Sequence, residues 1–275
     1  MKFKIIVDSS SNLVSTSYQD KEIGFSVVPL TLRIDGKDYV DNDDINVNEM
    51  LDNLNKCTDC KTSCPSPQAY LNELDEAEYN FIVTITSKLS GSFNSACVAR
   101  NMAKDPNKVF VLDSKGTAGS LILLVEKLFS LIKEGKEYEE IVQEITKARD
   151  EINLLFVLDK FDNLVRNGRI NKVIAFIASK ISIKPLCYAD DGEIKVKEQI
   201  RTLRGVSHRL VHNIGKMCAE TKNKICVICH TKNLEFAKLI KELIEQDYQF
   251  KEVRILDNRG LCSFYSLEGG IIVTF

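Results

Sequence analysis

The feature that most constrains this chain is an alternation of short apolar runs with helical patterns across its first half. Residues 4–7, 80–86 and 108–112 have the length and apolar character of buried strands. Helical patterns follow at 93–104 and 119–133, and Gly135 ends the second of them. Strands that alternate with helices are typical of parallel sheets joined by right-handed crossovers. We therefore expect an N-terminal α/β sandwich with a parallel-type sheet.

The pattern changes after about residue 151. Strand-like runs at 183–188 and 194–200 flank Asp190-Asp191-Gly192, a hairpin signal. Helical patterns at 203–219 and 234–244 alternate with apolar runs at 154–158, 225–229, 252–256 and 270–275. This mixture predicts a mixed or antiparallel sheet with helices. The fold class is thus α/β in two domains, an N-terminal domain at residues 1–155 and a C-terminal domain at 156–275.

A second hairpin signal and a polar loop lie between the first two apolar runs. Residues 25–34 are rich in β-branched side chains and stop at Asp35-Gly36, so 37–40 are expected to return as a strand. Helical spacing follows at 47–54, and residues 56–67, rich in Cys, Ser, Thr and Pro, are predicted to form a loop. Ser66-Pro67 then predicts a helix start, with serine as the N-cap and proline in the first turn.

Composition excludes several classes of protein. The 275 residues contain 37 Lys and Arg against 39 Asp and Glu, a net charge of −2, which argues against a binder of nucleic-acid backbones. The chain is 44% hydrophobic, too much for a disordered protein. It shows neither a signal-peptide pattern nor an apolar run long enough to span a membrane. We expect a cytoplasmic protein whose nine cysteines are free and mostly buried.

Hydroxyl-rich loops follow the predicted parallel strands. They are Asp8-Ser9-Ser10-Ser11, Ser87-Lys88-Leu89-Ser90-Gly91-Ser92 and Asp113-Ser114-Lys115-Gly116. The carboxyl ends of parallel strands form the ligand edge of an open α/β sheet, and helix N-termini there favour an anion. Helix capping alone is the alternative reading of each loop. The stiff segment Lys61-Thr62-Ser63-Cys64-Pro65-Ser66-Pro67 adds further hydroxyl donors for a carboxylate.

These loops carry a family resemblance. Thr62-Ser63-Cys64-Pro65-Ser66-Pro67 resembles the Thr-Ser-Gln-Pro-Ser-Pro motif of DegV proteins, a bacterial fatty-acid-binding family. Ser87-Lys88-Leu89-Ser90-Gly91-Ser92-Phe93 is similar to that family's Ser-x-Leu-Ser-Gly-Thr-Tyr segment. Further similar segments, in the same order, are Val7-Asp8-Ser9-Ser10, Val111-Leu112-Asp113-Ser114, Arg166-Asn167-Gly168-Arg169-Ile170, Ile183-Lys184-Pro185-Leu186, Asp191-Gly192-Glu193-Ile194 and Arg201.

The resemblance implies a non-enzymatic carrier that holds one long-chain fatty acid between its two domains. Such a protein presents the carboxylate to a separate fatty-acid kinase subunit and supplies acyl chains for phospholipid synthesis. It implies no cofactor, no metal and no catalytic residue of its own. Thr62 and Ser90 would bind the carboxylate, with help from donors at Ser63, Gly91 and Ser92. Arg169 and Arg201 would belong to the polar network or to the surface that faces the kinase.

The chain departs from the family pattern near its C-terminus. Many members carry a histidine there in a His-x-Gly-Pro-Gly segment, whereas this chain reads Cys262-Ser263-Phe264-Tyr265-Ser266-Leu267-Glu268-Gly269-Gly270. Tyr265 or Ser263 would then supply the missing hydrogen bond. Cys64 replaces the usual glutamine, and Ser92 replaces the usual threonine. Residues 173–183 and Ile271, Ile272 and Val273 are candidates for the tunnel lining, with plain core as the alternative.

Two other kinds of site remain open. Cys57-x-x-Cys60 with Cys64 has partial zinc spacing, so metal or redox chemistry is the alternative to structural thiols. Cys226-Val227-Ile228-Cys229-His230 spells a haem-attachment string, but residues three apart in a strand face opposite sides. The alternative function is a small serine hydrolase or transferase with Ser90 as nucleophile and His208, His212 or His230 as base. No Gly-x-Ser-x-Gly elbow supports it.

Overall fold

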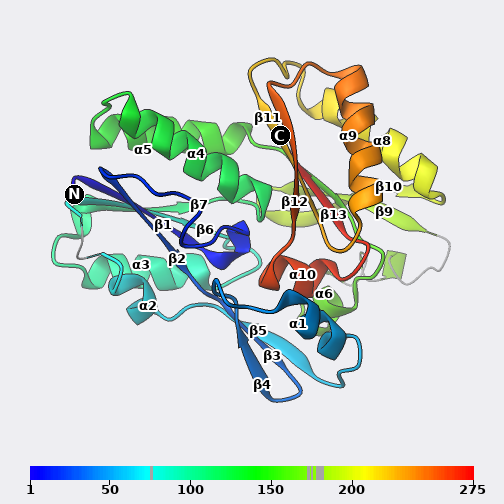
Figure 1. The fold of residues 1–275 in the computed structure, drawn as a ribbon, viewed down its shortest axis with the longest axis horizontal. Helices are drawn as coiled ribbons and strands as arrows, with labels where there is room; N and C mark the ends of the chain where they lie inside the picture. The colour runs from blue at the N-terminus through cyan, green and yellow to red at the C-terminus, as the bar shows by residue number, and fades with distance from the viewer. Residues whose placement is uncertain (75–76, 172–173, 175, 178–182) are drawn as a thin grey trace.

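The computed structural model describes residues 1–74, 77–171, 174, 176–177 and 183–275, and Figure 1 shows their arrangement. The N-terminal part contains a parallel sheet with the strand order β2-β1-β6-β7. Its strands are β1 (Phe3–Asp8), β2 (Ile23–Val28), β6 (Tyr79–Thr84) and β7 (Val109–Asp113). The parallel sheet expected from the alternation of strands and helices is confirmed.

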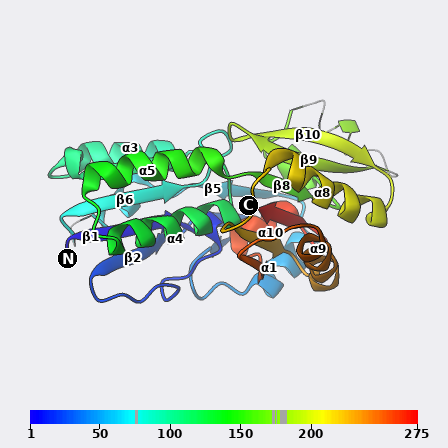
Figure 2. The same cartoon turned by 90° about the horizontal axis from the view of Figure 1, so that it is seen from above.

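Helices cover both faces of the parallel sheet (Figures 1 and 2). They are α2 (Pro67–Leu71), α3 (Ser92–Met102), α4 (Gly119–Lys133) and α5 (Tyr138–Glu151), and a short turn, η2 (Pro106–Lys108), precedes β7. Alternate residues of β1 point to opposite faces. Ile5 and Val7 pack with α4 and α5, whereas Ile6 packs with α2 and α3. Helix α5 was not predicted, although its Ile141 and Ile145 have the spacing of a buried helical face.

The C-terminal part forms a mixed sheet with the strand order β10-β9-β8-β13-β11-β12. Neighbouring strands are antiparallel except β11 and β12, which are parallel. The strands are β8 (Leu154–Val157), β9 (Lys184–Asp190), β10 (Glu193–Ile200), β11 (Ile225–His230), β12 (Glu252–Asp257) and β13 (Ile271–Thr274). The mixed sheet expected for this part is confirmed. The division predicted at residue 155 falls inside β8.

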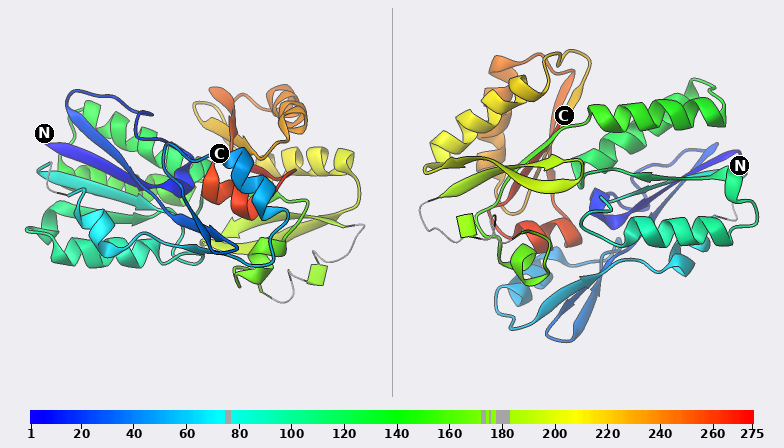
Figure 3. Two further views of the ribbon diagram at one scale, coloured as in Figure 1. Left: turned by 60° about the horizontal axis from the view of Figure 1, so that its bottom comes forward. Right: turned by 180° about the vertical axis from the view of Figure 1, so that it is seen from behind.

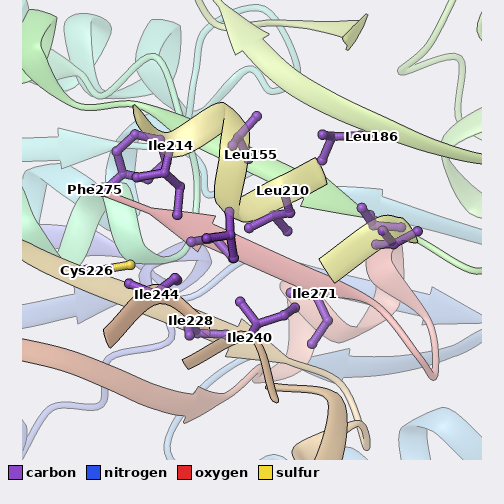
Figure 4. Packing of buried hydrophobic residues seen from close by; sticks show 14 of the residues in the cluster. Leu155, Leu186, Leu210, Ile214, Cys226, Ile228, Ile240, Ile244, Ile271 and Phe275 are labelled. Carbon is purple, nitrogen blue, oxygen red and sulfur yellow. The ribbon is translucent and has the colours of Figure 1, made fainter. Parts of the chain in front are cut away.

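The two faces of the mixed sheet have different neighbours. Leu155 and Val157 belong to a cluster with the buried sides of α8 (Leu203–Met217) and α9 (Leu234–Asp247), shown in Figure 4. Leu154 and Phe156 point to the other face, toward the start of α4 and toward α6 (Asp162–Arg166). Because successive residues of a strand point to opposite faces, Leu155 and Val157 lie in the core with α8 and α9, whereas Leu154 and Phe156 face the N-terminal part.

A small antiparallel sheet, β4-β3-β5, lies beside α1 (Val47–Leu54), and two predictions were wrong here. Its strands are β3 (Thr31–Ile34), β4 (Lys37–Val40) and β5 (Cys60–Ser63). The run 25–34 is two strands rather than one, because the chain leaves the parallel sheet at Pro29, which has no N–H to donate. The segment expected to be loop contains β5, because the free edge of β3 provides a pairing partner. The Asp35-Gly36 hairpin and the helix start at Ser66 are confirmed.

Helix α10 (Gly260–Ser266) comes from the C-terminal part but packs against N-terminal elements. It contacts α1, β3 and the turn η1 (Ser9–Ser11), and Figure 3 shows it next to α1. The Leu261 N–H donates to Asp41 (2.9 Å), and the Arg259 guanidinium donates to the Asn42 carbonyl (2.8 Å). Phe264 is fully buried in the cluster formed with the small sheet. This helix was not predicted, and it places part of the cavity described next.

Helices that combine the length and the apolarity needed to cross a bilayer do not occur among the residues that the structure describes.

Candidate ligand site

A cavity of about 280 Å³ lies where the parallel sheet, α10 and the mixed sheet meet. One wall consists of apolar side chains from β8, β9, β10 and β13 and the segment after β8; these are Leu154, Phe156, Leu158, Ala189, Ile194 and Ile272. Leu30, Ile85, Leu89 and Leu261 add apolar surface from the N-terminal part and α10. Such a mainly apolar cavity with a few polar groups is typical of a small-molecule site.

Polar groups from two separate segments line one part of this cavity. Thr62 and Ser63 come from the end of β5, and Ser90 and Gly91 from the loop that enters α3. The two segments touch, because a Cβ added to Gly91 would lie only 3.0 Å from the Cys64 Sγ. Four of the five residues that the resemblance assigned to the carboxylate thus lie together, although the two segments are far apart in the sequence.

Ser92 lies behind Ser90 rather than in the cavity wall. The Ser92 N–H donates to the Ser90 Oγ (3.2 Å), and the two hydroxyls lie 3.0 Å apart. The Ser92 N–H occupies one acceptor site on Ser90, and both contacts restrict the orientation of its hydroxyl. Ser92 was expected to bind the ligand directly. It is fully buried and is not among the described residues that line the cavity, so its part in ligand binding stays a prediction.

Tyr265 and Arg169 also line the cavity, as do the polar residues Thr86, Lys115, Thr117 and Ser266. The Tyr265 hydroxyl lies 2.7 Å from the Thr62 Oγ1. Burial raises the pKa of Tyr265, so its hydroxyl stays neutral and keeps a proton to donate. The Arg169 Nη1 donates to the Asn167 carbonyl (2.5 Å), which holds the guanidinium near the loop after α6. Tyr265 was one of two candidates for the missing histidine; the other, Ser263, is buried and donates to the Asn258 carbonyl.

Arg201 does not line the cavity. It is an exposed residue between β10 and α8. Arg201 is not among the described residues that line the cavity, and its role stays a prediction.

The first hydroxyl-rich loop, at Asp8, serves the fold and does not line the cavity. The Asp8 carboxylate accepts hydrogen bonds from the Ile85 N–H (2.8 Å) and from the Ser10 N–H (3.1 Å) and O–H (2.5 Å). Burial raises the pKa of Asp8, and likewise that of Asp41, to about 6. For this loop the capping interpretation holds, because its hydroxyls bond the chain itself. The loops at Ser90 and Lys115 do reach the cavity.

Only part of the predicted apolar lining is found there. Ile272 faces the cavity, but Ile271 and Val273 lie on the opposite face of β13, in the cluster with α8 and α9. The prediction ignored the strand alternation. Residues 173, 175 and 178–182 lie outside the described residues. Within the same run, Ile174 is buried next to Leu158 in the apolar cluster on the cavity side of the sheet.

A metal site at the cysteines and a haem-attachment role find little support. Among the described residues, three or more His, Cys, Asp or Glu side chains do not come together as a metal site would require. Cys226 and Cys229 belong to the clusters on opposite faces of the mixed sheet, as the strand period predicts. His230 is buried at the end of β11, where its Nδ1 accepts from the Asn233 N–H (3.3 Å).

A serine-enzyme mechanism would require a base beside Ser90. His208 and His212 are exposed on α8, and His230 is buried at the end of β11, where it is bonded to Asn233. The Ser90 hydroxyl pairs with Ser92 instead. The residues that the structure describes thus provide Ser90 with hydrogen-bond partners but with no histidine.

Sequence reasoning missed how the β9–β10 hairpin closes the cavity. Gly192 at its tip lines the cavity, and its carbonyl accepts from the Thr86 hydroxyl (3.1 Å). Beside it, the Lys115 Nζ pairs with Asp191 (2.7 Å) and Asp150 (3.2 Å). The hairpin was visible in the sequence. Its docking on the loops after β6 and β7 depends on the distance between the two sheets, which no local signal encodes.

Gly192 offers a matched test of this docking. Gly192 and Gly36 both occupy hairpin turns at φ +83°, where a side chain is strained. A Cβ at Gly36 meets no atom within 4 Å, whereas one at Gly192 would overlap the Thr86 hydroxyl. We expect Gly36→Ala to cost about 1 kcal/mol of unfolding free energy and Gly192→Ala to cost roughly 1–3 kcal/mol more. Chemical denaturation of both variants checks this, and equal losses would contradict the docking.

Comparisons with known proteins agree with this geometry. A family model described as "Uncharacterised protein, DegV family" matches residues 2–273. A DegV domain-containing protein from Streptococcus gordonii is 34% identical over 280 residues, covering 100% of this chain and 99% of the relative. The Streptococcus pneumoniae Fatty Acid Kinase (Fak) B3 protein, solved loaded with linoleic acid, matches with a TM-score of 0.94 and 32% identity over 100% of this chain and 99% of the other.

A second solved structure has the same two-domain fold. A DegV family protein from Eubacterium eligens, loaded with heptadecanoic acid, has a TM-score of 0.91 and 30% identity to this chain, covering 99% of this chain and 98% of the other. The family model and the Streptococcus gordonii relative both span essentially the whole sequence. The resemblance seen in the motifs is thereby confirmed, and the chain belongs to the DegV family.

Proposed function

We propose that this protein binds one long-chain fatty acid in the cavity between its N-terminal and C-terminal domains, which divide close to residue 155. The observation that carries the proposal is the distribution of groups around the cavity. Hydroxyls and the Arg169 guanidinium line the cavity together with a larger set of apolar side chains, and no carboxylate is among its described lining residues. The relatives solved with linoleic and heptadecanoic acid support the same ligand class.

The apolar wall accounts for the affinity. Each buried CH₂ group contributes about 0.8 kcal/mol, so a C16 chain offers roughly 12 kcal/mol before costs. Immobilising the ligand and ordering its chain remove a large part of that gain. The remaining affinity depends on how well Leu154, Phe156 and Ile272 enclose the acyl chain.

The head group needs few donors. The hydroxyls of Thr62 and Ser90 would donate to the two carboxylate oxygens, and the segments at Ser63 and Gly91 would add donors beside them. Tyr265, fixed against Thr62, takes the place of the histidine found in many family members. Arg169 would add a favourable charge, while Ser92 orients Ser90.

We also propose that the bound carboxylate is presented to a separate fatty-acid kinase, so that the chemistry takes place on the partner. The relative named as a fatty acid kinase B3 protein supports this role, and Arg201 is placed on the exposed surface where a partner can reach it. The acyl group would then be available for phospholipid synthesis.

Mass spectrometry of the freshly purified protein tests the ligand class. Native spectra should show one bound species per chain, and organic extraction should release a fatty acid of about C14–C18. The delipidated protein should then take up one equivalent of added palmitate or oleate. A protein that is purified empty and does not bind either acid would overturn the proposal, and labelling of Ser90 by a serine-directed covalent probe would favour the hydrolase or transferase.

A further inference from the structure

Cys57 and Cys60 form a dithiol that the fatty-acid site leaves unexplained. Cys60 is buried at the start of β5, and Cys57 is half-buried in the turn that precedes it. The Arg166 Nη1 lies 3.9 Å from each of the two sulfurs. The two thiols therefore flank one cation on α6. Burial raises the pKa of the Cys60 thiol, and the neighbouring Arg166 guanidinium opposes that rise in part.

The turn between the two cysteines is held in one conformation. The Asp35 carboxylate accepts from the Thr58 N–H (3.1 Å), the Thr58 hydroxyl (3.0 Å) and the Asp59 N–H (2.9 Å). The Asp59 carbonyl in turn accepts from the Asp35 N–H (2.9 Å). These contacts fix the backbone of the Cys-x-x-Cys turn, so that both sulfurs are directed toward Arg166.

Cys60 is also connected to the head-group part of the cavity. Its thiol donates to the buried Asn163 Oδ1 (3.4 Å), and the Asn163 Nδ2 donates to the Phe264 carbonyl (2.7 Å). Phe264 is followed by Tyr265, whose hydroxyl contacts Thr62. Thr62 in turn lies two residues after Cys60 on β5. Asn163 belongs to helix α6. The next residue of that helix, Leu164, lines the cavity.

We propose that Cys57 and Cys60 form a reversible disulfide that weakens fatty-acid retention, an inference that rests on the proposed function. A small-molecule disulfide is the oxidant. The Cys57 thiolate attacks it and releases one thiolate; the Cys60 thiolate then attacks the Cys57 sulfur and releases the second. Two protons pass to the released thiolates, so two protein thiols become one disulfide while the oxidant becomes two thiols.

Formation of the Cys57–Cys60 disulfide removes the hydrogen that the Cys60 thiol donates to Asn163. The Asn163 Oδ1 is then buried without that donor, which loosens the contact of α6 with β5 and α10. Leu164, Thr62 and Tyr265 all depend on this contact for their positions. Disulfide formation is therefore expected to lower the affinity for fatty acid by about fivefold. This is the lower end of the change in affinity that one site usually causes at another.

Oxidised glutathione and peptide mapping test the dithiol directly. Trypsin cleavage at Lys56 and Lys61 isolates Cys57 and Cys60 in one peptide without Cys64. Oxidation should remove two hydrogens from this peptide, without a glutathione adduct, and dithiothreitol should reverse the change. A peptide that keeps both thiols, or that retains glutathione on Cys57, would overturn the proposal.

Three variants separate the disulfide from the hydrogen bond. Cys60→Ser keeps a donor for Asn163, so oleate affinity should stay normal and should not respond to oxidant. Cys60→Ala lacks the donor and should reproduce the oxidised affinity in the reduced state. Cys97→Ser, a half-buried thiol on α3, should keep the full response. An unchanged affinity after complete disulfide formation would refute the coupling.

A readout independent of the ligand keeps this test separate from the proposed function. Amide hydrogen exchange in α6 should be faster in the oxidised protein whether or not oleate binds. If the reduced protein binds no fatty acid, the proposed function fails, while peptide mapping and exchange still decide whether the dithiol closes and loosens α6. Unchanged exchange after disulfide formation would contradict the inference.

Discussion

Replacing Thr62 and Ser90 together by alanine is expected to weaken fatty-acid binding by about 100-fold. Each hydroxyl would donate to a charged carboxylate, and a hydrogen bond of that kind contributes about 1.5 kcal/mol or more, so that two of them correspond to roughly two factors of ten. Titration calorimetry with oleate on the delipidated protein measures the change. Thermal unfolding should show a moderate loss. Thr62 and Ser90 are only half-buried, but Tyr265 and the buried Ser92 each lose a hydrogen-bond partner.

Ser87→Ala is the matched control for this double variant. Ser87 lies in the same loop as Ser90, but it is exposed and does not line the cavity. Its removal should leave the dissociation constant unchanged. If the double variant bound oleate as tightly as the unmodified chain, the carboxylate would have to lie elsewhere, with Arg169 as the next position to test.

Placing a large side chain among the apolar residues of the cavity is expected to lower the affinity for fatty acid about as much as the loss of Thr62 and Ser90. Ala189 on β9 lines the cavity next to Ile194, and Ala189→Phe would occupy space that the acyl chain needs. Displacing about four methylenes costs roughly 3 kcal/mol, or about 100-fold in affinity for a C16–C18 acid. A C10 acid, which leaves that space empty, should lose much less.

The comparison of chain lengths is the decisive part of this experiment. Ala219→Phe, at an exposed alanine after α8, serves as the control and should affect neither acid. Equal losses for C10 and C16 acids in Ala189→Phe would mean that the substitution disturbs the head group or the fold, and that the tail does not lie along β9.

Local sequence signals were sufficient for most of the secondary structure and for the polar residues of the site. The apolar runs and hairpin signals predicted the parallel sheet, the Asp191-Gly192 turn and the helix start at Ser66, because each depends on residues close together in the chain. The segments with Thr62 and Ser90 could be assigned to one ligand only through the family resemblance. Nothing in their own composition distinguishes a ligand loop from a helix cap.

Tertiary structure decided the features that depend on contacts between distant segments. The segment at Cys60 became a strand because β3 had a free edge. The Asp8 carboxylate accepts from the Ile85 N–H and from the Ser10 hydroxyl, so both groups are used within the fold. Ile272 faces the cavity while Ile271 does not, because the position of β13 in the sheet determines which side of the strand meets the N-terminal domain.

The sequence by itself determined most of the strands and helices, with β5, α5 and α10 as the exceptions, and which residues carry the polar chemistry, since propensity, turn residues and apolar spacing act over a few positions. The tertiary structure alone brought β5, the loop before α3, and α10 together. It did so by burying Phe264 and pairing Tyr265 with Thr62 across 203 positions of the chain. Such long-range contacts arise from the packing of whole layers, and local patterns do not specify how layers meet.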